Sequence, residues 1–150
     1  MIIFTQSKSC FLDITNGGAN LDTYKSIGAI DSTFLKLINP NNNRYFSKSL
    51  LYSFESSNPK IDMRYICVSA NKKPQAMALV QIVELSVDVI LKNIKVSALS
   101  KRILNKFFCN DHIKIMFCGN VFLSGEYGIS FAANANRKQT IAQIGTALDI

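Results

Sequence analysis

Residues 63–85 read MRYICVSANKKPQAMALVQIVEL, and this stretch decides the class of fold. Met63 to Ser69 is rich in strand-forming residues, and Asn71-Lys72-Lys73-Pro74 is typical of a turn. A second strand is predicted from Gln75 to about Leu85, because this run is apolar on both faces, as in a central strand covered on both sides. Two strands joined by so short a turn must be antiparallel.

Helical spacing of apolar residues precedes this hairpin. Asp31 can cap a short helix that runs to Asn39. The apolar residues of 45–54 then follow one helical stripe, and Pro59 ends that helix. The stripe consists of Tyr45, Phe46, Leu50, Leu51 and Phe54, which we expect in the core. Residues 1–30 show no clear period, so we expect a short strand or irregular chain there.

Further elements are predicted after the hairpin. Residues 96–108 have the spacing of an amphipathic helix, and His112 to Cys118 alternates as a strand does. A glycine-punctuated stretch and a short strand, Ile129 to Ala132, follow, and a last helix begins at about Asn136. In that helix we expect Ile141, Ile144 and Leu148 to face inward. Helices interspersed among strands favour an α/β or α+β domain built on a layered sheet.

Length and composition are those of one globular domain. The chain has 150 residues, of which 48% are hydrophobic and 18% charged, and this excludes the disordered class. No apolar run reaches the roughly 20 residues of a membrane-spanning helix. The start of the chain lacks the basic and apolar regions of a secretion signal. We therefore expect a soluble, cytoplasmic, single domain over residues 1–150.

The formal net charge of +7 would attract a polyanion such as nucleic acid, anionic lipid or a phosphorylated cofactor. The basic residues are dispersed, however, and no run of four or more occurs, so the charge alone does not predict a partner. The cysteines Cys10, Cys67, Cys109 and Cys118 stand far apart, and His112 is the one histidine. Since no metal-ligand spacing is present, we expect no metal site and mostly buried, reduced thiols.

The stretch from Phe117 to Lys138 is the best candidate for a functional site. Its glycines are Gly119, Gly125 and Gly128, which let backbone amides approach a ligand. Asn134 or Asn136 can cap the last helix, whose first turn carries Arg137 and Lys138. A helix N-terminus with two added cations predicts a phosphate or pyrophosphate site. The alternative is a strand-turn-strand in which the glycines serve only the turns, because their spacing matches neither the dinucleotide fingerprint nor the P-loop.

One carboxylate in this stretch is a candidate general base. Glu126 lies between two glycines and beside Tyr127, in a loop that follows an apolar strand. A general base must lie close to the proton that it takes, and the sequence does not reveal that proximity. A carboxylate exposed in a turn is the alternative interpretation.

Several of these segments resemble bacterial GNAT-type N-acyltransferases of a group often found in Bacteroidota. The resembling segments are Phe46-x3-Leu50-x3-Phe54-Glu55, Met63-Arg64-Tyr65, the hairpin with Pro74, and above all residues 117–128, FCGNVFLSGEYG. The likeness covers roughly residues 40–150, whereas 1–39 form a poorly defined N-terminal segment. The chain looks like the amino-terminal part of such a domain, whose later strands would lie beyond Ile150.

The resemblance implies a mixed, largely antiparallel central sheet flanked by helices, and transfer of an acyl group from acetyl-CoA or another acyl-CoA to an amine. It implies that the backbone at Phe117, Cys118, Gly119 and Asn120 lies along the donor. It also implies that Asn134, Asn136, Arg137 and Lys138 face the pyrophosphate, with Glu126 as base. No metal, membrane or nucleic acid is expected in this case, and self-association is expected if the domain is truncated.

Two other hypotheses stay open at this point. A non-catalytic basic module could bind nucleic acid or a protein partner, and its affinity would then fall steeply with salt. An inactive domain fragment would instead expose apolar sheet edges and self-associate.

Overall fold

The computed structural model describes residues 2–4, 19–86, 112–122 and 128–148. Its strands are β1 (Ile2–Phe4), β2 (Ala19–Tyr24), β3 (Asp62–Ala70), β4 (Lys73–Ser86), β5 (His112–Cys118) and β6 (Ile129–Phe131). Its helices are α1 (Ser32–Ile38), α2 (Lys48–Ser57) and α5 (Arg137–Leu148), with 3-10 turns η1 (Ile27–Ala29) and η2 (Arg44–Phe46). The helix predicted over 96–108 lies outside the described residues.

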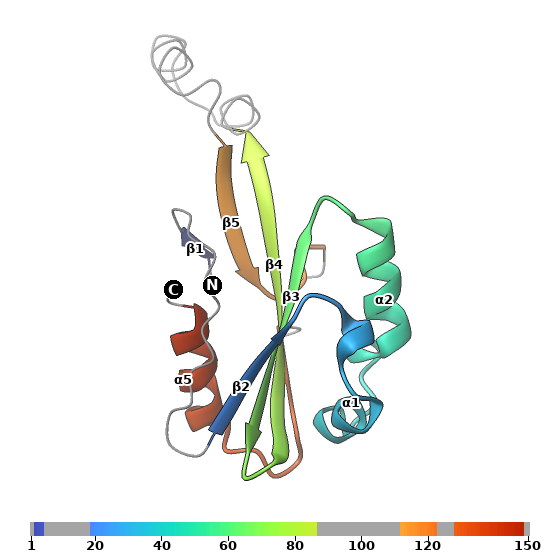
Figure 1. The fold of residues 1–150 in the computed structure, drawn as a ribbon, viewed down its shortest axis with the longest axis vertical. Coiled ribbons are helices and arrows are strands. Elements are labelled where there is room, and N and C mark those ends of the chain that lie inside the picture. The colour runs from blue at the N-terminus through green and yellow to red at the C-terminus, as the bar shows by residue number, and fades with distance from the viewer. Residues whose placement is uncertain (1, 5–18, 87–111, 123–127, 149–150) are drawn as a thin grey trace.

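The strands form one sheet in the order β1-β5-β4-β3-β2, with β6 also paired to β4. Every pairing between described strands is antiparallel. Figure 1 shows α1 and α2 on one side of this sheet and α5 on the other. The molecule is therefore an α+β protein with three layers, and its described sheet is antiparallel rather than mixed.

The predicted hairpin is confirmed as β3 and β4. Asn71 and Lys72 have φ values of 51° and 62°, as both central residues of a tight type I′ turn require. Asparagine tolerates the left-handed region better than most residues, which explains its place in this turn. β4 is the central strand, and its residues 76–81 are all buried because helices cover both faces.

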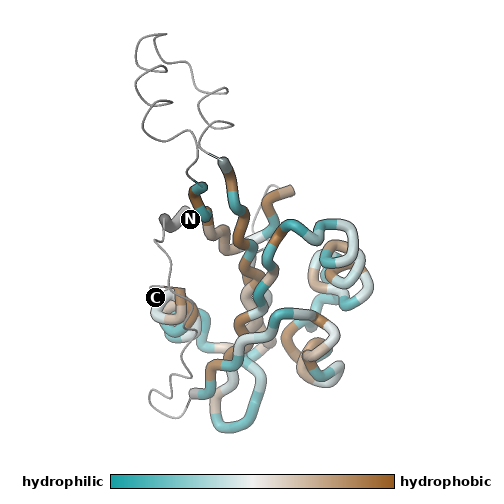
Figure 2. The backbone as a smooth tube through the Cα atoms, turned by 45° about the horizontal axis from the view of Figure 1, so that its top comes forward, coloured by the Kyte–Doolittle hydropathy of each residue, from teal (hydrophilic) through white to brown (hydrophobic). Residues whose placement is uncertain are grey.

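Each face of the sheet carries its own apolar core. The α1 and α2 side includes Ile27, Leu35, Ile38, Phe46, Leu51, Met63, Tyr65, Cys67, Met77 and Leu79. The α5 side includes Ile66, Val68, Ala76, Ala78, Val80, Met116, Ile144, Ala147 and Leu148. Figure 2 shows hydrophobic residues concentrated along the central strands. Alternate residues of β3 and β4 thus supply the two cores, as the twofold period of a strand dictates.

The helix boundaries follow from local capping. The Asp31 carboxylate accepts hydrogen bonds from the amides of Thr33 and Phe34, as predicted for the start of α1. The single helical stripe predicted over 45–54 is wrong. Ser47 has extended backbone and caps α2 through the amide of Leu50, so the chain before it forms the separate turn η2.

Two predicted core residues lie elsewhere. Tyr45 is 37% exposed, because the break at Ser47 takes it out of the helical stripe. Ile141 is 51% exposed, and α5 instead buries Thr140 together with Ile144, Ala147 and Leu148. The predictions for Ile144 and Leu148 are confirmed, and the prediction for Ile141 is wrong because Thr140 takes the inward position in the first turns of α5.

β6 continues β5 along the same edge of β4. Cys118 pairs with Val80 and Ile129 pairs with Ala78, so the two strands flank Leu79. Leu79 accepts a hydrogen bond from the Gly119 amide at 2.8 Å and donates one to the Gly128 carbonyl at 2.9 Å. β5 and β6 thus form one strand that is interrupted opposite Leu79, between Gly119 and Gly128.

Glycine is required at both ends of this interruption. Gly119 has a φ of +135°, which L side chains rarely adopt. A Cβ on Gly128 would lie 2.8 Å from the Cys118 carbonyl oxygen and 3.3 Å from the Gly119 Cα. These two glycines therefore serve close backbone approach, while Gly125 lies outside the described residues.

Among the helices of the described residues, none combines the length and the apolar character that crossing a bilayer requires.

Candidate functional site

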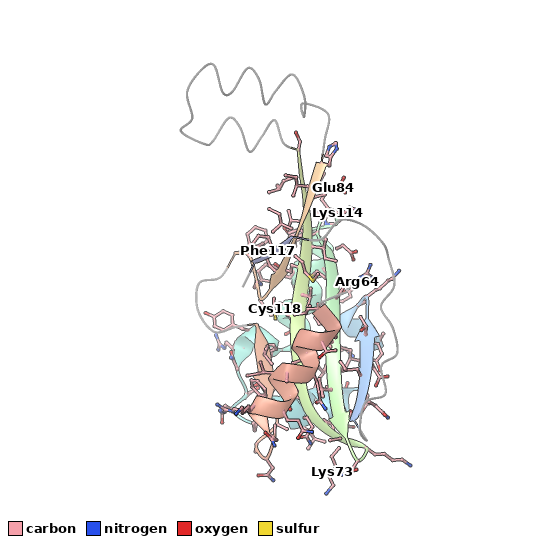
Figure 3. The ribbon with its side chains drawn as sticks, turned by 90° about the vertical axis from the view of Figure 1, so that its left-hand side faces the viewer. Arg64, Lys73, Glu84, Lys114, Phe117 and Cys118 are labelled. Atoms are coloured by element: carbon pink, nitrogen blue, oxygen red, sulfur yellow. The ribbon has the colours of Figure 1, made fainter. Side chains whose placement is uncertain are left out.

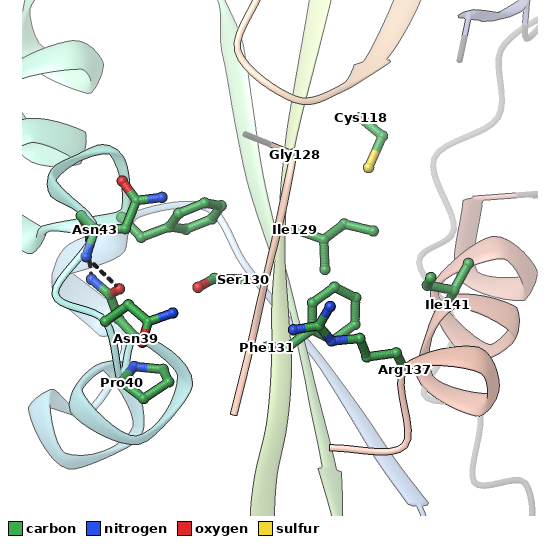
Figure 4. Close-up of a pocket in the computed structure, with 12 residues that line it drawn as sticks. Asn39, Pro40, Asn43, Cys118, Gly128, Ile129, Ser130, Phe131, Arg137 and Ile141 are labelled. Atoms are coloured by element: carbon green, nitrogen blue, oxygen red, sulfur yellow. Dashed lines mark hydrogen bonds between the residues drawn. The ribbon is translucent and has the colours of Figure 1, made fainter. Parts of the chain in front are cut away.

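A groove of about 670 Å³ runs along the outer edge of β6. Figure 4 shows β6 in its middle, with the turn that follows α1 on one side and α5 on the other. The groove is lined by Asn39, Pro40, Asn41, Asn43, Phe46, Cys118, Gly128, Ile129, Ser130, Phe131, Arg137 and Ile141. It thus joins both helical layers around one strand edge.

Backbone groups of β6 are available to a ligand in this groove. The bonds from Leu79 N to Gly128 O and from Ala132 N to Gln75 O show which β6 residues face β4. Because the pattern of an antiparallel ladder alternates, the N–H and C=O of Ile129 and Phe131 point to the outer edge. No strand in the described part of the chain pairs with that edge. The edge therefore offers two donor and acceptor pairs, about 7 Å apart by strand geometry.

The first turn of α5 forms the positive end of the groove. The Arg137 guanidinium lies 5.4 Å from the centre of the Phe131 ring, a cation–π contact that holds it over β6. Lys138 follows, and the first turn carries no acidic residue. Cations at a helix N-terminus oppose the helix dipole, so this arrangement favours an anionic ligand that would relieve the repulsion.

The opposite wall is the turn between α1 and η2. The Asn39 carboxamide donates to the Asn43 carbonyl at 2.9 Å and accepts from the Asn43 amide at 2.8 Å. Ser130 Oγ donates to the Ile38 carbonyl at 2.8 Å, which ties β6 to the end of α1. This wall is uncharged, so among the described lining residues Arg137 is the one charged group.

Cys118 lies at the end of the groove where β5 stops. Figure 3 shows it with Phe117 at the end of β5, beside α5. It is a free, partly exposed thiol, and burial raises the pKa of that thiol. A raised pKa keeps the sulfur protonated and weakly nucleophilic at neutral pH. Cys118 is therefore a wall of the groove rather than an activated nucleophile.

The residues that sequence reasoning placed beside a donor are distributed over several elements. Cys118 lines the groove, whereas Phe117 pairs with Gln81 on β4 and with Ile2 on β1. Gly119 donates its amide to Leu79 at the strand break. The Asn120 side chain accepts a hydrogen bond from the Phe122 amide at 2.9 Å and so shapes the next turn.

The candidate phosphate residues lie together at the start of α5. Asn136 caps the helix, since its Oδ1 accepts from the Gln139 amide at 3.3 Å, while Asn134 is exposed in the preceding turn. Arg137 lines the groove, and Lys138 is exposed next to it. Glu126, the candidate base, lies outside the described residues.

Sequence reasoning missed most of the groove. The edge of β6 could not be found, because only the pairing with β4 shows which backbone groups stay free. The turn Asn39–Asn43 did carry a signal, since a run of asparagines after Pro40 supplies many side-chain amides. That signal indicates a turn but does not reveal which strand the turn faces.

The described residues contain no group of three or more His, Cys, Asp or Glu side chains that could hold a metal ion. The groove itself combines strand-edge amides that point away from β4 with a cationic helix N-terminus. Comparisons of the chain with protein-family models, with curated proteins and with solved structures found no match.

Proposed function

We propose that the chain is an acyl-CoA-dependent N-acyltransferase of the GNAT type, or its amino-terminal part, and that the groove along β6 receives the donor. One observation carries the proposal: the outer edge of β6, with which no described strand pairs, leads to the cationic start of α5. Coenzyme A has a matching construction, since its pantetheine arm carries two amides in an extended chain and ends in a diphosphate.

The layering of the fold supports this proposal. With β5 and β6 counted as one interrupted strand, the described elements from β2 onward are a strand, two helices, three antiparallel strands and a helix on the other face, an order that suits the family that residues 117–128 resemble. In this arrangement the diphosphate lies at Arg137 and the pantetheine follows β6 from Phe131 toward Ile129. The thioester then arrives near Gly128 and Cys118.

The proposed chemistry is attack of an amine nitrogen on the thioester carbonyl. The C–N bond forms, the C–S bond breaks, and the proton that the amine loses ends on the sulfur, so that coenzyme A leaves as its thiol. The groove residues hold and orient the donor, which lowers the barrier by fixing the reacting geometry. In the proposal Glu126 takes the proton from the amine.

Charge reversal at the start of α5 tests the proposal. In calorimetric titrations with coenzyme A we expect micromolar binding to the wild type and at least about a hundredfold loss in R137E/K138E, because a charged partner becomes repulsive. K36E/K60E is the matched control, since both lysines are exposed, neither lines the groove, and the two pairs of substitutions change the net charge equally.

Thermal unfolding of the same variants separates binding from folding. Acidic residues at the first positions of α5 complement the helix dipole, so R137E/K138E should be at least as stable as the wild type. If R137E/K138E and K36E/K60E lost equal affinity for coenzyme A, the loss would come from the net charge of the protein and not from a site at the start of α5. A folded wild type that binds no coenzyme A at millimolar concentration would refute the donor site, and steeply salt-dependent binding of nucleic acid would favour a basic binding module.

A further inference from the structure

Gln81 is a polar side chain in an apolar layer. It is fully buried on central strand β4, on the same face as Met77 and Leu79. Its cross-strand neighbours on that face are Met63 on β3 and Phe117 on β5. An apolar residue would pack here at lower cost, because a buried carboxamide must be compensated by hydrogen bonds.

Only half of the Gln81 carboxamide is compensated. Its Oε1 accepts a hydrogen bond from the Val121 amide at 2.8 Å, across 40 positions of sequence. Among the residues that the structure describes, its Nε2 has no hydrogen-bond partner. A buried donor without a partner is destabilising, so packing alone does not account for this residue.

The bond to Val121 joins the central strand to the chain that leaves the sheet at the strand break. Along one face of β4, Met77 lies opposite Ser130 and Leu79 is bonded to Gly119 and Gly128. Gln81 is the next residue on that face, and Val121 lies against it. The segment after Gly119 is therefore attached to the sheet one step beyond the groove residues Gly128 and Ser130.

Two further contacts of residues 120–122 involve no strand. Asn120 bonds to Phe122 within the turn, and the Phe122 ring stacks on Phe54 of α2 with centroids 5.9 Å apart. Phe122 is 57% exposed, so that stacking closes no core. Gln81 is thus the side chain of the sheet that holds this segment in register.

We infer that Gln81 is a positioning residue for the groove: by holding Val121 it fixes the strand break at Gly119 and the adjoining wall at Cys118. The inference rests on the proposed function only for the identity of the ligand. The geometric role of Gln81 is independent of that function, because the reactivity of Cys118 can be measured without any ligand.

The test measures the alkylation rates of Cys118 and Cys67 in the folded 150-residue chain, with peptide mass spectrometry to separate the two sites. The Kd for coenzyme A is measured on the same variants. Q81M removes the acceptor and keeps the volume, whereas V121P removes the donor from the other side. Q75M is the control, because Gln75 lies on the same strand but donates only to the carbonyls of Lys73 and Pro74.

Q81M and V121P should each raise the Cys118 rate about five- to tenfold, the factor expected for one hydrogen bond, with Cys67 unchanged. The Kd for coenzyme A should rise by a similar factor, and Q75M should match the wild type. Q81M and V121P remove the same hydrogen bond, so the Cys118 alkylation rate of the double variant should equal that of either single variant. If Q81M does not fold, V121P still decides the question.

A parallel rise at Cys118 and Cys67 would mean global destabilisation and would overturn the inference, as would no change at Cys118 in either variant. Failure of the wild type to bind coenzyme A would refute the proposed function instead. The rates at Cys118 would still decide the role of Gln81.

Discussion

Replacing Gly128 by alanine tests the geometry on which the groove depends. The added Cβ would lie 2.8 Å from the Cys118 carbonyl oxygen, 3.2 Å from its carbon and 3.3 Å from the Gly119 Cα. All three atoms are backbone, so no side chain can rotate away to make room. Ordinary contact requires the two chain segments to separate by roughly half an ångström or more.

The loss of stability can be worked from this geometry. Overpacking of this kind costs about 1–3 kcal/mol, and separation of the segments weakens the hydrogen bonds of Leu79 to Gly119 and Gly128, at about 1 kcal/mol each. Alanine also lowers the conformational entropy of the unfolded chain, which offsets about 0.4–1 kcal/mol of this loss. We expect a net loss of about 2–4.5 kcal/mol, which corresponds to a Tm lower by roughly 4–18 °C.

Urea unfolding followed by circular dichroism measures this loss, with G145A as the matched control. Gly145 lies within α5, and a Cβ there meets no atom within 4 Å. G145A should therefore stabilise the protein by about 0.5–1 kcal/mol through helix propensity. If the free energy of unfolding of G128A lies within about 0.5 kcal/mol of the wild-type value, the backbone at Gly128 does not lie against Cys118 and Gly119. The strand break would then not have the described geometry.

Other contacts give further expectations. The Glu55 carboxylate accepts from Ser26 Oγ at 2.8 Å and from the Ile27 amide at 2.6 Å, so E55A should cost about 2–4 kcal/mol in urea unfolding; an unchanged midpoint would contradict this contact. Hydrogen bonds from backbone amides, first that of Phe34, lower the pKa of Asp31 below 3.8, so its contribution to stability is present above that pH and is lost as the pH falls through the lowered pKa. D31N should flatten this acid loss in thermal melts at pH 2–5. Burial, and secondarily Asp22, raises the pKa of the Cys67 thiol to about 12. Iodoacetamide at pH 8 should therefore leave native Cys67 unlabelled, whereas Cys118 should react slowly and be protected by coenzyme A. Equal labelling of both cysteines would contradict the described burial.

Local features of the fold were predictable because their causes are local. The β3–β4 hairpin follows from a turn sequence between two apolar runs, and the start of α1 follows from the Asp31 cap. The start of α2 also has a local cause, but that cause lies in one residue that apolar spacing does not register. Apolar spacing over 45–54 continues smoothly through Ser47, and the cap that Ser47 forms competes with helix at a single residue.

The candidate site was predictable only in part. Asn136, Arg137 and Lys138 were expected together at a helix start, because capping and sequence adjacency place them there. Ile141 was expected in the core, yet it lines the groove, since the direction of the buried face of α5 depends on the sheet beneath it. Apolar periodicity identifies a helix more reliably than it identifies which residues face inward.

The sequence by itself determined the hairpin, the alternation of helices with strands and the cationic start of the last helix, because each depends on residues a few positions apart. Only the tertiary structure decided that β6 extends β5 along β4, that the amides of Ile129 and Phe131 point away from β4, and that Gln81 is buried against Val121. These features arise from contacts between residues far apart in the sequence, such as Val80 with Cys118, Ala78 with Ile129 and Gln81 with Val121. Such pairings depend on which strand edges remain once the cores on both faces are filled, and no local pattern specifies that outcome.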